Sequence, residues 1–150
     1  MPRTYAQERY AVASTADYRL LVPRLFEHAG ARRLWYIEGT LGAGKTTLIQ
    51  HLCAHLGIPQ AAVTSPSFAI VHEYSRPQDP QVVVAYHLDL YRVQTDDELR
   101  HLGLCEYLTS GVYCFVEWPA RARALTAQPA CTLHVRAQDD ESRTLVLQCS

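Results

Sequence analysis

One stretch constrains this chain more than any other: Gly39-Thr-Leu-Gly-Ala-Gly-Lys45-Thr46 matches the pattern G-x-x-x-x-G-K-[ST] without a mismatch. Glycines let backbone N–H groups converge on phosphate oxygens. A helix that starts after them adds unsatisfied N–H groups and the positive end of its dipole. The chain has no asparagine and a single lysine, and that lysine is Lys45. The motif therefore predicts a phosphate-binding loop between a strand and a helix.

This loop has an expected role for each of its parts. Lys45 is expected to reach the β and γ phosphates of a nucleotide, and the Thr46 hydroxyl to ligate Mg²⁺. The usual guanine-reading motif, Asn-Lys-x-Asp, cannot occur in a chain without asparagine, so ATP is the expected nucleotide. The alternative is a chance glycine-rich turn. The predicted nucleotide-binding residues are Gly39, Thr40, Leu41, Gly42, Ala43, Gly44, Lys45, Thr46 and Thr47.

Helices are predicted on both sides of the loop. Apolar residues at helical spacing follow Ser14 or Thr15, and the segment ends at Gly30. Pro23 lies inside it and removes one backbone hydrogen bond, which predicts a kink or a shortened helix. A second helix follows the loop, with its apolar face formed by Leu48, Ile49, Leu52, Cys53 and Leu56, and a third opens at the capping box Thr95–Glu98.

Short apolar segments alternate with these helices and are predicted strands. Val82–Leu88 is nearly all apolar, which favours burial on both faces, and Ser75–Pro80 is expected to be a loop. The polar turn Gln138–Ser142 joins two further segments into a closing hairpin. The strands are predicted at Arg9–Ala13, Leu34–Glu38, Phe68–Tyr74, Val82–Leu88, Val112–Val116, Cys131–Arg136 and Thr144–Cys149.

The alternation of strands and helices defines the expected fold. It favours an α/β, P-loop NTPase-like three-layer sandwich, with a mixed, mainly parallel sheet and a C-terminal β-hairpin. At 150 residues, the chain is expected to form one domain over residues 1–150.

Composition excludes several classes of protein. The net charge is −1, so a strong basic field and tight unaided binding to nucleic acid are not expected. No apolar stretch is long enough to span a membrane, and no secretion signal is visible, so a cytoplasmic location is expected. The five cysteines lack Cys-x-x-Cys spacing and are interpreted as reduced thiols, mostly in the core. His51 and His55 have no further ligand beside them, so a solvated helix face is favoured over a metal site.

Two acids end apolar strands, where an α/β sheet carries its chemistry. Asp89 follows Val82–Leu88 and is the candidate for the second Mg²⁺-binding element of P-loop NTPases, against an ordinary turn or cap aspartate. Glu117 follows Val112–Val116 and is a candidate to ligate Mg²⁺, directly or through water, or to position the attacking water. Trp118 is either a core aromatic or a platform for a partner or nucleotide.

The segment Thr64-Ser65-Pro66-Ser67-Phe68 lies between a helix and a strand. Its hydroxyls could sense the γ-phosphate, as switch loops do, but taken alone a plain Ser-Pro turn is the better interpretation. Arg121 and Arg123 are interpreted as solvated loop residues.

These elements occur together and in order: Gly39–Thr47, Thr64–Phe68, His87-Leu-Asp89-Leu-Tyr91-Arg92 and Glu117-Trp118-Pro119. The set resembles the bacterial TsaE family, the small ATPase of tRNA threonylcarbamoyladenosine biosynthesis, over about residues 15–120.

The resemblance implies a Mg²⁺-dependent ATPase that is weak alone and supports modification of the adenosine beside the tRNA anticodon. It implies two partners, the threonylcarbamoyl-transferring enzyme and its non-catalytic paralogue, with tRNA contacted through them. It assigns catalytic roles to Lys45, Asp89 and Glu117. It assigns the binding of Mg²⁺ to Thr46, Asp89 and Glu117. It also makes Thr64–Phe68 a switch-like loop and Trp118 a functional residue, with a basic residue expected at Arg136 or Arg143.

The sequence departs from the family pattern at Ser67, where threonine is usual, at His72, and at Pro23 in the first helix. Two other functions stay open. A small-molecule kinase would use Arg121 and Arg123 as a lid over an anionic acceptor. An ATP-gated interaction module would bind nucleotide without hydrolysing it.

Overall fold

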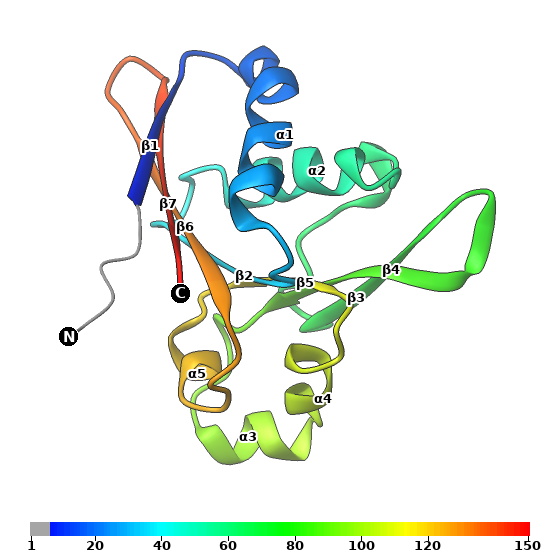
Figure 1. The fold of residues 1–150 in the computed structure, drawn as a ribbon. Coiled ribbons are helices and arrows are strands. Elements are labelled where there is room, and N and C mark those ends of the chain that lie inside the picture. Colours follow the sequence, from blue (N-terminus) through cyan, green and yellow to red (C-terminus); the bar gives the residue numbers. More distant parts are fainter. Residues whose placement is uncertain (1–6) are drawn as a thin grey trace.

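A mixed β-sheet forms the centre of the computed structural model, which describes residues 7–150 (Figure 1). The seven strands lie in the order β1-β7-β6-β2-β5-β4-β3. The four central strands, β6, β2, β5 and β4, pair in parallel, and the outer pairings are antiparallel. This confirms the predicted sheet and its C-terminal hairpin. The strands are β1 Gln7–Val12, β2 Leu34–Glu38, β3 Val71–Arg76, β4 Asp79–Asp89, β5 Tyr113–Glu117, β6 Ala130–Ala137 and β7 Arg143–Cys149.

Helices cover both faces of the sheet and complete the three layers (Figure 1). The first two, α1 and α2, lie on one face, and the three short helices α3, α4 and α5 lie on the other. None of the helices described is long and apolar enough to cross a membrane. The helices are α1 Tyr18–Ala29, α2 Lys45–His55, α3 Asp96–His101, α4 Leu104–Leu108 and α5 Ala120–Arg123, and 3₁₀ turns lie at Thr15–Asp17 and Gln60–Ala62.

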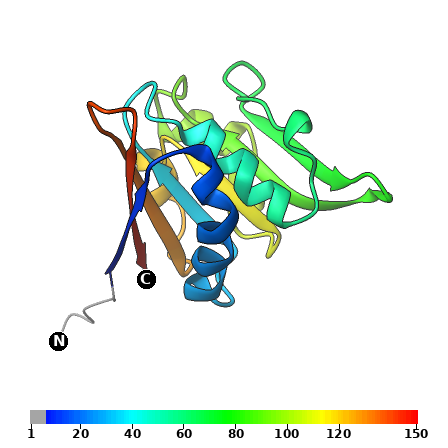
Figure 2. The same cartoon turned by 90° about the horizontal axis from the view of Figure 1, so that it is seen from above.

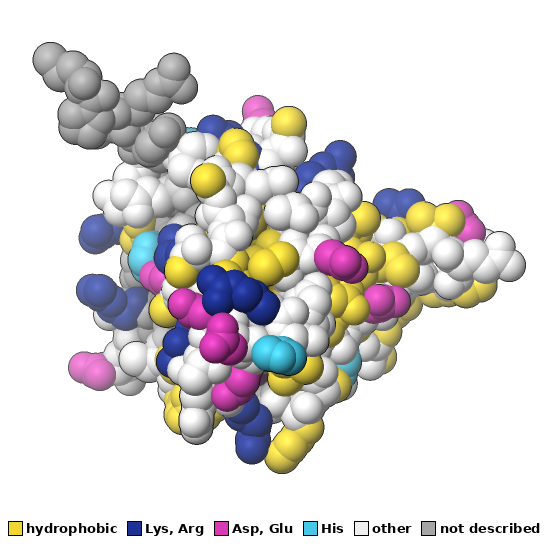
Figure 3. Space-filling view, turned by 90° about the horizontal axis from the view of Figure 1, so that it is seen from below, with side chains coloured by type: hydrophobic (Ala, Val, Ile, Leu, Met, Phe, Trp, Pro, Cys, Tyr) yellow, Lys and Arg dark blue, Asp and Glu magenta, His cyan; other side chains and the backbone are white. Residues whose placement is uncertain are grey.

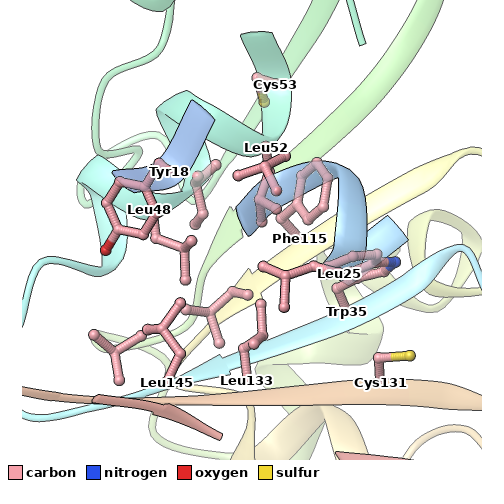
Figure 4. Close-up of a cluster of buried hydrophobic side chains, with 14 of the residues drawn as sticks. Tyr18, Leu25, Trp35, Leu48, Leu52, Cys53, Phe115, Cys131, Leu133 and Leu145 are labelled. Carbon is pink, nitrogen blue, oxygen red and sulfur yellow. The ribbon is translucent and has the colours of Figure 1, made fainter. Parts of the chain in front are cut away.

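Strand β2 supplies side chains to both apolar layers because successive residues of a strand point to opposite faces. Trp35 and Ile37 join the core under α1 and α2, whereas Leu34 and Tyr36 join the core on the other face. Figure 4 shows the first core, where Trp35 lies among side chains from both helices and from β5 and β6. Burial on both faces fixes β2 at the centre of the sheet, directly before the predicted phosphate loop.

The first helix is not shortened by its proline. It continues through Pro23 to Ala29 and ends at Gly30, whose φ of 60° suits glycine. Leu21 and Leu25, on either side of the proline, are buried in the core. Packing of this face stabilises the helix against the loss of one backbone hydrogen bond.

The hairpin of β3 and β4 differs most from the prediction. The expected loop at Ser75–Pro80 is wrong, since Arg76 pairs with Asp79 and only two residues join the strands. The strand expected from Phe68 begins instead at Val71. Val82 is 52% exposed, so the expected burial of Val82–Leu88 on both faces is wrong for its first half. The hairpin extends past the helices (Figure 2), and there cross-strand hydrogen bonds satisfy the backbone without a covering layer.

The cysteines correct one further prediction. Cys131 and Cys149 form a disulfide, so the interpretation of all five as reduced thiols is wrong for this pair. The two residues lie directly opposite each other on the antiparallel strands β6 and β7, a proximity that their spacing in the sequence does not reveal. Cys53 and Cys114 are free thiols in the core, as predicted, and burial raises the pKa of each to about 12.

The disulfide predicts a measurable contribution to stability. It closes a loop of 18 residues, and restriction of the unfolded chain by such a loop contributes about 3 kcal/mol. We expect a reductant to lower the free energy of unfolding by that amount, measured by denaturant titration. The same treatment should leave a Cys131→Ser variant unchanged. Titration of thiols in unreduced, unfolded protein should find three; finding five would contradict the disulfide.

Candidate functional site

The predicted site residues meet at the carboxyl ends of three parallel strands. The phosphate loop follows β2, Asp89 is the last residue of β4, and Glu117 is the last residue of β5. Asp89 lies opposite Glu117 in the register of β4 with β5, which brings both carboxylates to the same face of the sheet. They line one pocket of about 370 Å³ together with the loop and the start of α2. The topology thus assembles a site from residues far apart in the sequence.

The pocket includes most of the predicted residues. Two of its lining residues were missed or left open by the sequence: Tyr91 had no assigned role, and Arg143 was one of two candidates for a basic residue. The predicted residues that line the pocket are Leu41, Gly42, Ala43, Gly44, Lys45, Thr46, Thr47, Ser65, Ser67, Asp89, Glu117 and Trp118. Gly39, Thr40, Thr64, Pro66 and Phe68 belong to the same segments but do not line it.

Two glycines of the loop are required by its geometry. At Gly44, which precedes α2, φ is 96°, a conformation that side chains other than glycine strongly disfavour. At Gly39 a Cβ atom would lie 2.7 Å from the backbone oxygen of Val135 on β6. Glycine at both positions allows the loop to turn sharply. The turn brings the first N–H groups of α2 to the pocket.

Lys45 is buried in the pocket between neutral partners. Its ammonium donates a hydrogen bond of 2.6 Å to the Gly39 carbonyl and lies 3.5 Å from the centroid of the Trp118 ring. Burial lowers the pKa of Lys45, while the negative charges of Glu117 and Asp89 oppose that shift. A phosphate oxygen is a stronger partner for an ammonium than a carbonyl or a ring is. The arrangement therefore favours an anion beside Lys45.

Trp118 contributes through an unusual backbone conformation. Its φ is 55°, in the left-handed region that a bulky residue rarely adopts. This turn after β5 places the indole in the pocket, 4.9 Å from the ring of Tyr91 between centroids, as well as against Lys45. The half-buried indole packs against the core on the α3–α5 face and also lines the pocket, so both interpretations of Trp118 stay predictions.

Glu117 is held by two hydrogen bonds. The Thr46 hydroxyl donates to Glu117 Oε1 across 3.4 Å, and His87 Nε2 lies 2.8 Å from Glu117 Oε2. Both Glu117 and His87 are buried, so Glu117 is not an ordinary surface glutamate. His87 begins the His87–Arg92 motif, but the motif alone predicted no role for it.

Asp89 is bound to the Thr64–Phe68 segment. The hydroxyls of Ser65 and Ser67 donate to Asp89 Oδ2 at 3.3 and 3.4 Å, and the other oxygen accepts from the Tyr91 backbone N–H. Asp89 thus serves as a local turn residue and also tethers this segment to the pocket. The departure from the family pattern at Ser67 retains the hydroxyl that makes this contact.

The arginines divide into one at the pocket and two elsewhere. Arg143, at the start of β7, donates to the Ala43 carbonyl at 2.8 Å and lines the pocket. Arg121 donates to the Val93 carbonyl, and Arg123 pairs with Glu38 at 2.6 Å. Neither of the latter lines the pocket, so neither forms the anion-facing lid that a kinase would need.

The donor set fits a magnesium ion that arrives with a nucleotide. Mg²⁺ prefers oxygen ligands and retains waters and phosphate oxygens in its shell. Thr46, Asp89 and Glu117 place a hydroxyl and two carboxylates in the same pocket. Within residues 7–150, no group of three or more histidine, cysteine and acidic side chains is arranged to bind a metal without such help. His51 and His55 on α2 are not part of any such group.

Comparisons with known proteins support one family. The family model "Threonylcarbamoyl adenosine biosynthesis protein TsaE" matches residues 12–145. A tRNA threonylcarbamoyladenosine biosynthesis protein TsaE from Bacillus subtilis is 36% identical over 73% of this chain, and one from Haemophilus influenzae is 31% identical over 70%. The aligned parts span 65% and 63% of those relatives, just under two thirds of their lengths.

A solved structure supports the fold independently. The crystal structure of YdiB from Bacillus subtilis superposes with a TM-score of 0.69 and covers 98% of this chain and 88% of the other. The sequences are 22% identical, so this likeness bears on the fold alone.

The contact between Lys45 and Trp118 predicts an optical signal. A phosphate that draws the ammonium away changes the surroundings of the indole, so Mg·ATP should change tryptophan emission. Trp118→Phe should abolish this response. Trp35→Phe should keep it, because Trp35 is buried in the core away from the pocket. A response that survives Trp118→Phe and disappears in Trp35→Phe would contradict the assignment.

Proposed function

The chain belongs to the TsaE family of threonylcarbamoyl adenosine biosynthesis proteins, and we propose that it is a Mg²⁺-dependent ATPase supporting tRNA threonylcarbamoyladenosine biosynthesis. The observation that carries this proposal is the meeting of Lys45, Thr46, Asp89 and Glu117 in one pocket. Each is the residue type that a P-loop NTPase uses at that place. The protein would not itself transfer the threonylcarbamoyl group.

The pocket supports a division of roles during hydrolysis. The loop N–H groups and Lys45 bind and orient the phosphates, and Thr46, with Asp89 and Glu117, holds the metal. Mg²⁺, when bound, supplies charge that neutralises the phosphate oxygens. Glu117 is held at both oxygens, so it is oriented to fix a water or a metal ligand in a defined place. Positioning and electrostatics of this kind account for most of the catalysis of phosphoryl transfer.

Apolar side chains at the pocket support a role for partner proteins. Leu41, Phe68 and Tyr91 are large hydrophobic residues that are exposed, with Phe68 at 85%, and they belong to the segments that form the pocket. Exposed apolar residues that gather around a site are typical of surfaces that another protein covers. We propose that these partners are the two that the family resemblance implies, the threonylcarbamoyl-transferring enzyme and its non-catalytic paralogue, and that they raise a weak intrinsic rate.

Charge on the surface supports an indirect role for tRNA. The net charge is −1, and the face in Figure 3 carries acidic and basic side chains side by side rather than a continuous basic surface. Strong binding to RNA depends on many phosphate contacts from basic groups. The partners would then hold most of the tRNA.

Replacement of the only lysine tests the proposal directly. Lys45→Ala removes the charged donor to phosphate, and loss of such a contact weakens binding roughly 10- to 100-fold. Phosphate release from Mg·ATP should be slow for the chain alone, rise strongly with the transferase and paralogue, and be lost in Lys45→Ala. Arg100→Ala, which removes an exposed charge on α3, should behave as the wild type. Turnover that is unchanged by Lys45→Ala would refute the assigned site.

Replacement of the two acids tests the metal. Asp89→Asn and Glu117→Gln keep the shape of the side chain and remove its charge. Each should abolish most of the Mg²⁺ dependence of ATP binding and lower partner-stimulated hydrolysis roughly 100-fold or more. Asp97→Asn, an exposed acid on α3, is the matched control. A variant that retains both the Mg²⁺ dependence and the stimulated rate shows that its residue has another role.

A further inference from the structure

A line of buried polar side chains leads from Glu117 into the sheet, away from the pocket. His87 on β4 is fully buried, and its Nδ1 lies 3.0 Å from the hydroxyl of Tyr74 on β3. The same hydroxyl lies 3.2 Å from the Thr64 carbonyl oxygen, to which it can also donate. With the contact between His87 and Glu117, this forms a continuous series from the pocket to the start of the Thr64–Phe68 segment.

This series of contacts holds the Glu117 carboxylate on the side that faces away from the pocket. One oxygen of the carboxylate faces Thr46 at the pocket, and the other accepts from His87. A carboxylate held at one oxygen only can rotate, and the second contact removes that freedom. Partners that bind a functional side chain from outside the site fix its orientation in this way.

Hydrogen-bond chemistry makes each member of the series depend on the next. A carboxylate only accepts, so a neutral His87 places its hydrogen on Nε2 and leaves Nδ1 as an acceptor. The Tyr74 hydroxyl has one hydrogen and three neighbours that can accept it: His87 Nδ1 at 3.0 Å, the Thr64 carbonyl at 3.2 Å and His72 Nδ1 at 3.4 Å. The Thr64 carbonyl therefore competes with the imidazole for this hydrogen, and a shift of Thr64 changes how firmly Tyr74 holds His87.

The same segment contacts the other acid of the pocket directly. Ser65 and Ser67 donate to Asp89, while Thr64 reaches Glu117 through two intervening side chains. Both carboxylates are thereby tied to one segment of chain. We propose that Tyr74 and His87 are positioning residues that couple the placement of the Thr64–Phe68 segment to the orientation of the Glu117 carboxylate. The consequence for hydrolysis rests on the function proposed above.

Removal of the Tyr74 hydroxyl tests this coupling while it keeps the aromatic ring. In the complex with the transferase and its paralogue, Tyr74→Phe should lower kcat for Mg·ATP hydrolysis about 10- to 100-fold, the range typical for loss of a partner of a site residue. KM for ATP should stay unchanged, because the phosphate loop is untouched. Tyr86→Phe is the matched control on β4, since the Tyr86 ring packs against Tyr107 outside the series. A folded Tyr74→Phe with the kcat of the wild type overturns the proposal.

Two replacements of His87 provide a second test that does not depend on Tyr74→Phe folding. In His87→Gln the amide nitrogen can take the place of Nε2 and donate to Glu117, whereas in His87→Asn the shorter side chain cannot reach it. The proposal predicts a higher kcat for His87→Gln than for His87→Asn. Equal values would overturn it.

A measurement without hydrolysis separates this proposal from the proposed function. ¹⁵N spectra of labelled histidine report the hydrogen on each ring nitrogen of His87. Ser67→Ala disturbs the Thr64–Phe68 segment, and we expect it to shift the His87 signals in the wild type but much less in Tyr74→Phe. Equal shifts in both backgrounds would reject the coupling. If the wild type fails to hydrolyse ATP with its partners, the proposed function fails, and these spectra still decide the coupling.

Discussion

Parallel hydrogen bonding of β2 with β5, and of β5 with β4, brings the ends of three strands to one edge of the sheet. It sets Asp89 opposite Glu117 and places both beside the loop that follows β2. The register in turn depends on packing, because β2 contributes side chains to an apolar layer on each face, and a slip by one residue would move each set into the opposite layer, where it does not fit. The geometry of the site is thus a consequence of how the core packs.

The pocket gathers three charged groups that are all nearly buried: Lys45, Asp89 and Glu117. Each has hydrogen-bond partners within the protein, such as the Gly39 carbonyl for Lys45 and two serine hydroxyls for Asp89. Burial of charges with such partners costs free energy, which a ligand carrying both phosphate and a divalent cation would offset. The arrangement is therefore better explained by binding chemistry than by stability alone. It also gives the Thr64–Phe68 segment a direct contact with the site.

Sequence alone predicted the features that depend on local pattern. The phosphate loop, β2, the capping box before α3 and the closing hairpin all follow from residues that are neighbours in the chain. The errors arise where distant segments decide the outcome. The β3–β4 hairpin projects beyond its covering layer, and Cys131 meets Cys149 only through strand register. For the same reason the places of Tyr74, His87 and Arg143 could not be read from the sequence. The bound nucleotide, the metal and the single domain stay predictions.

The most direct test of the account is a crystal structure of the chain with Mg²⁺ and a non-hydrolysable ATP analogue. We expect the phosphates within the Gly39–Thr46 loop, with the Lys45 ammonium moved from the Gly39 carbonyl to a phosphate oxygen. The metal should be ligated by the Thr46 hydroxyl and should lie next to Asp89 and Glu117, in direct contact or through water. A nucleotide bound elsewhere, or phosphates in the loop with both carboxylates still engaged only with protein groups and remote from the metal, would contradict the central claim.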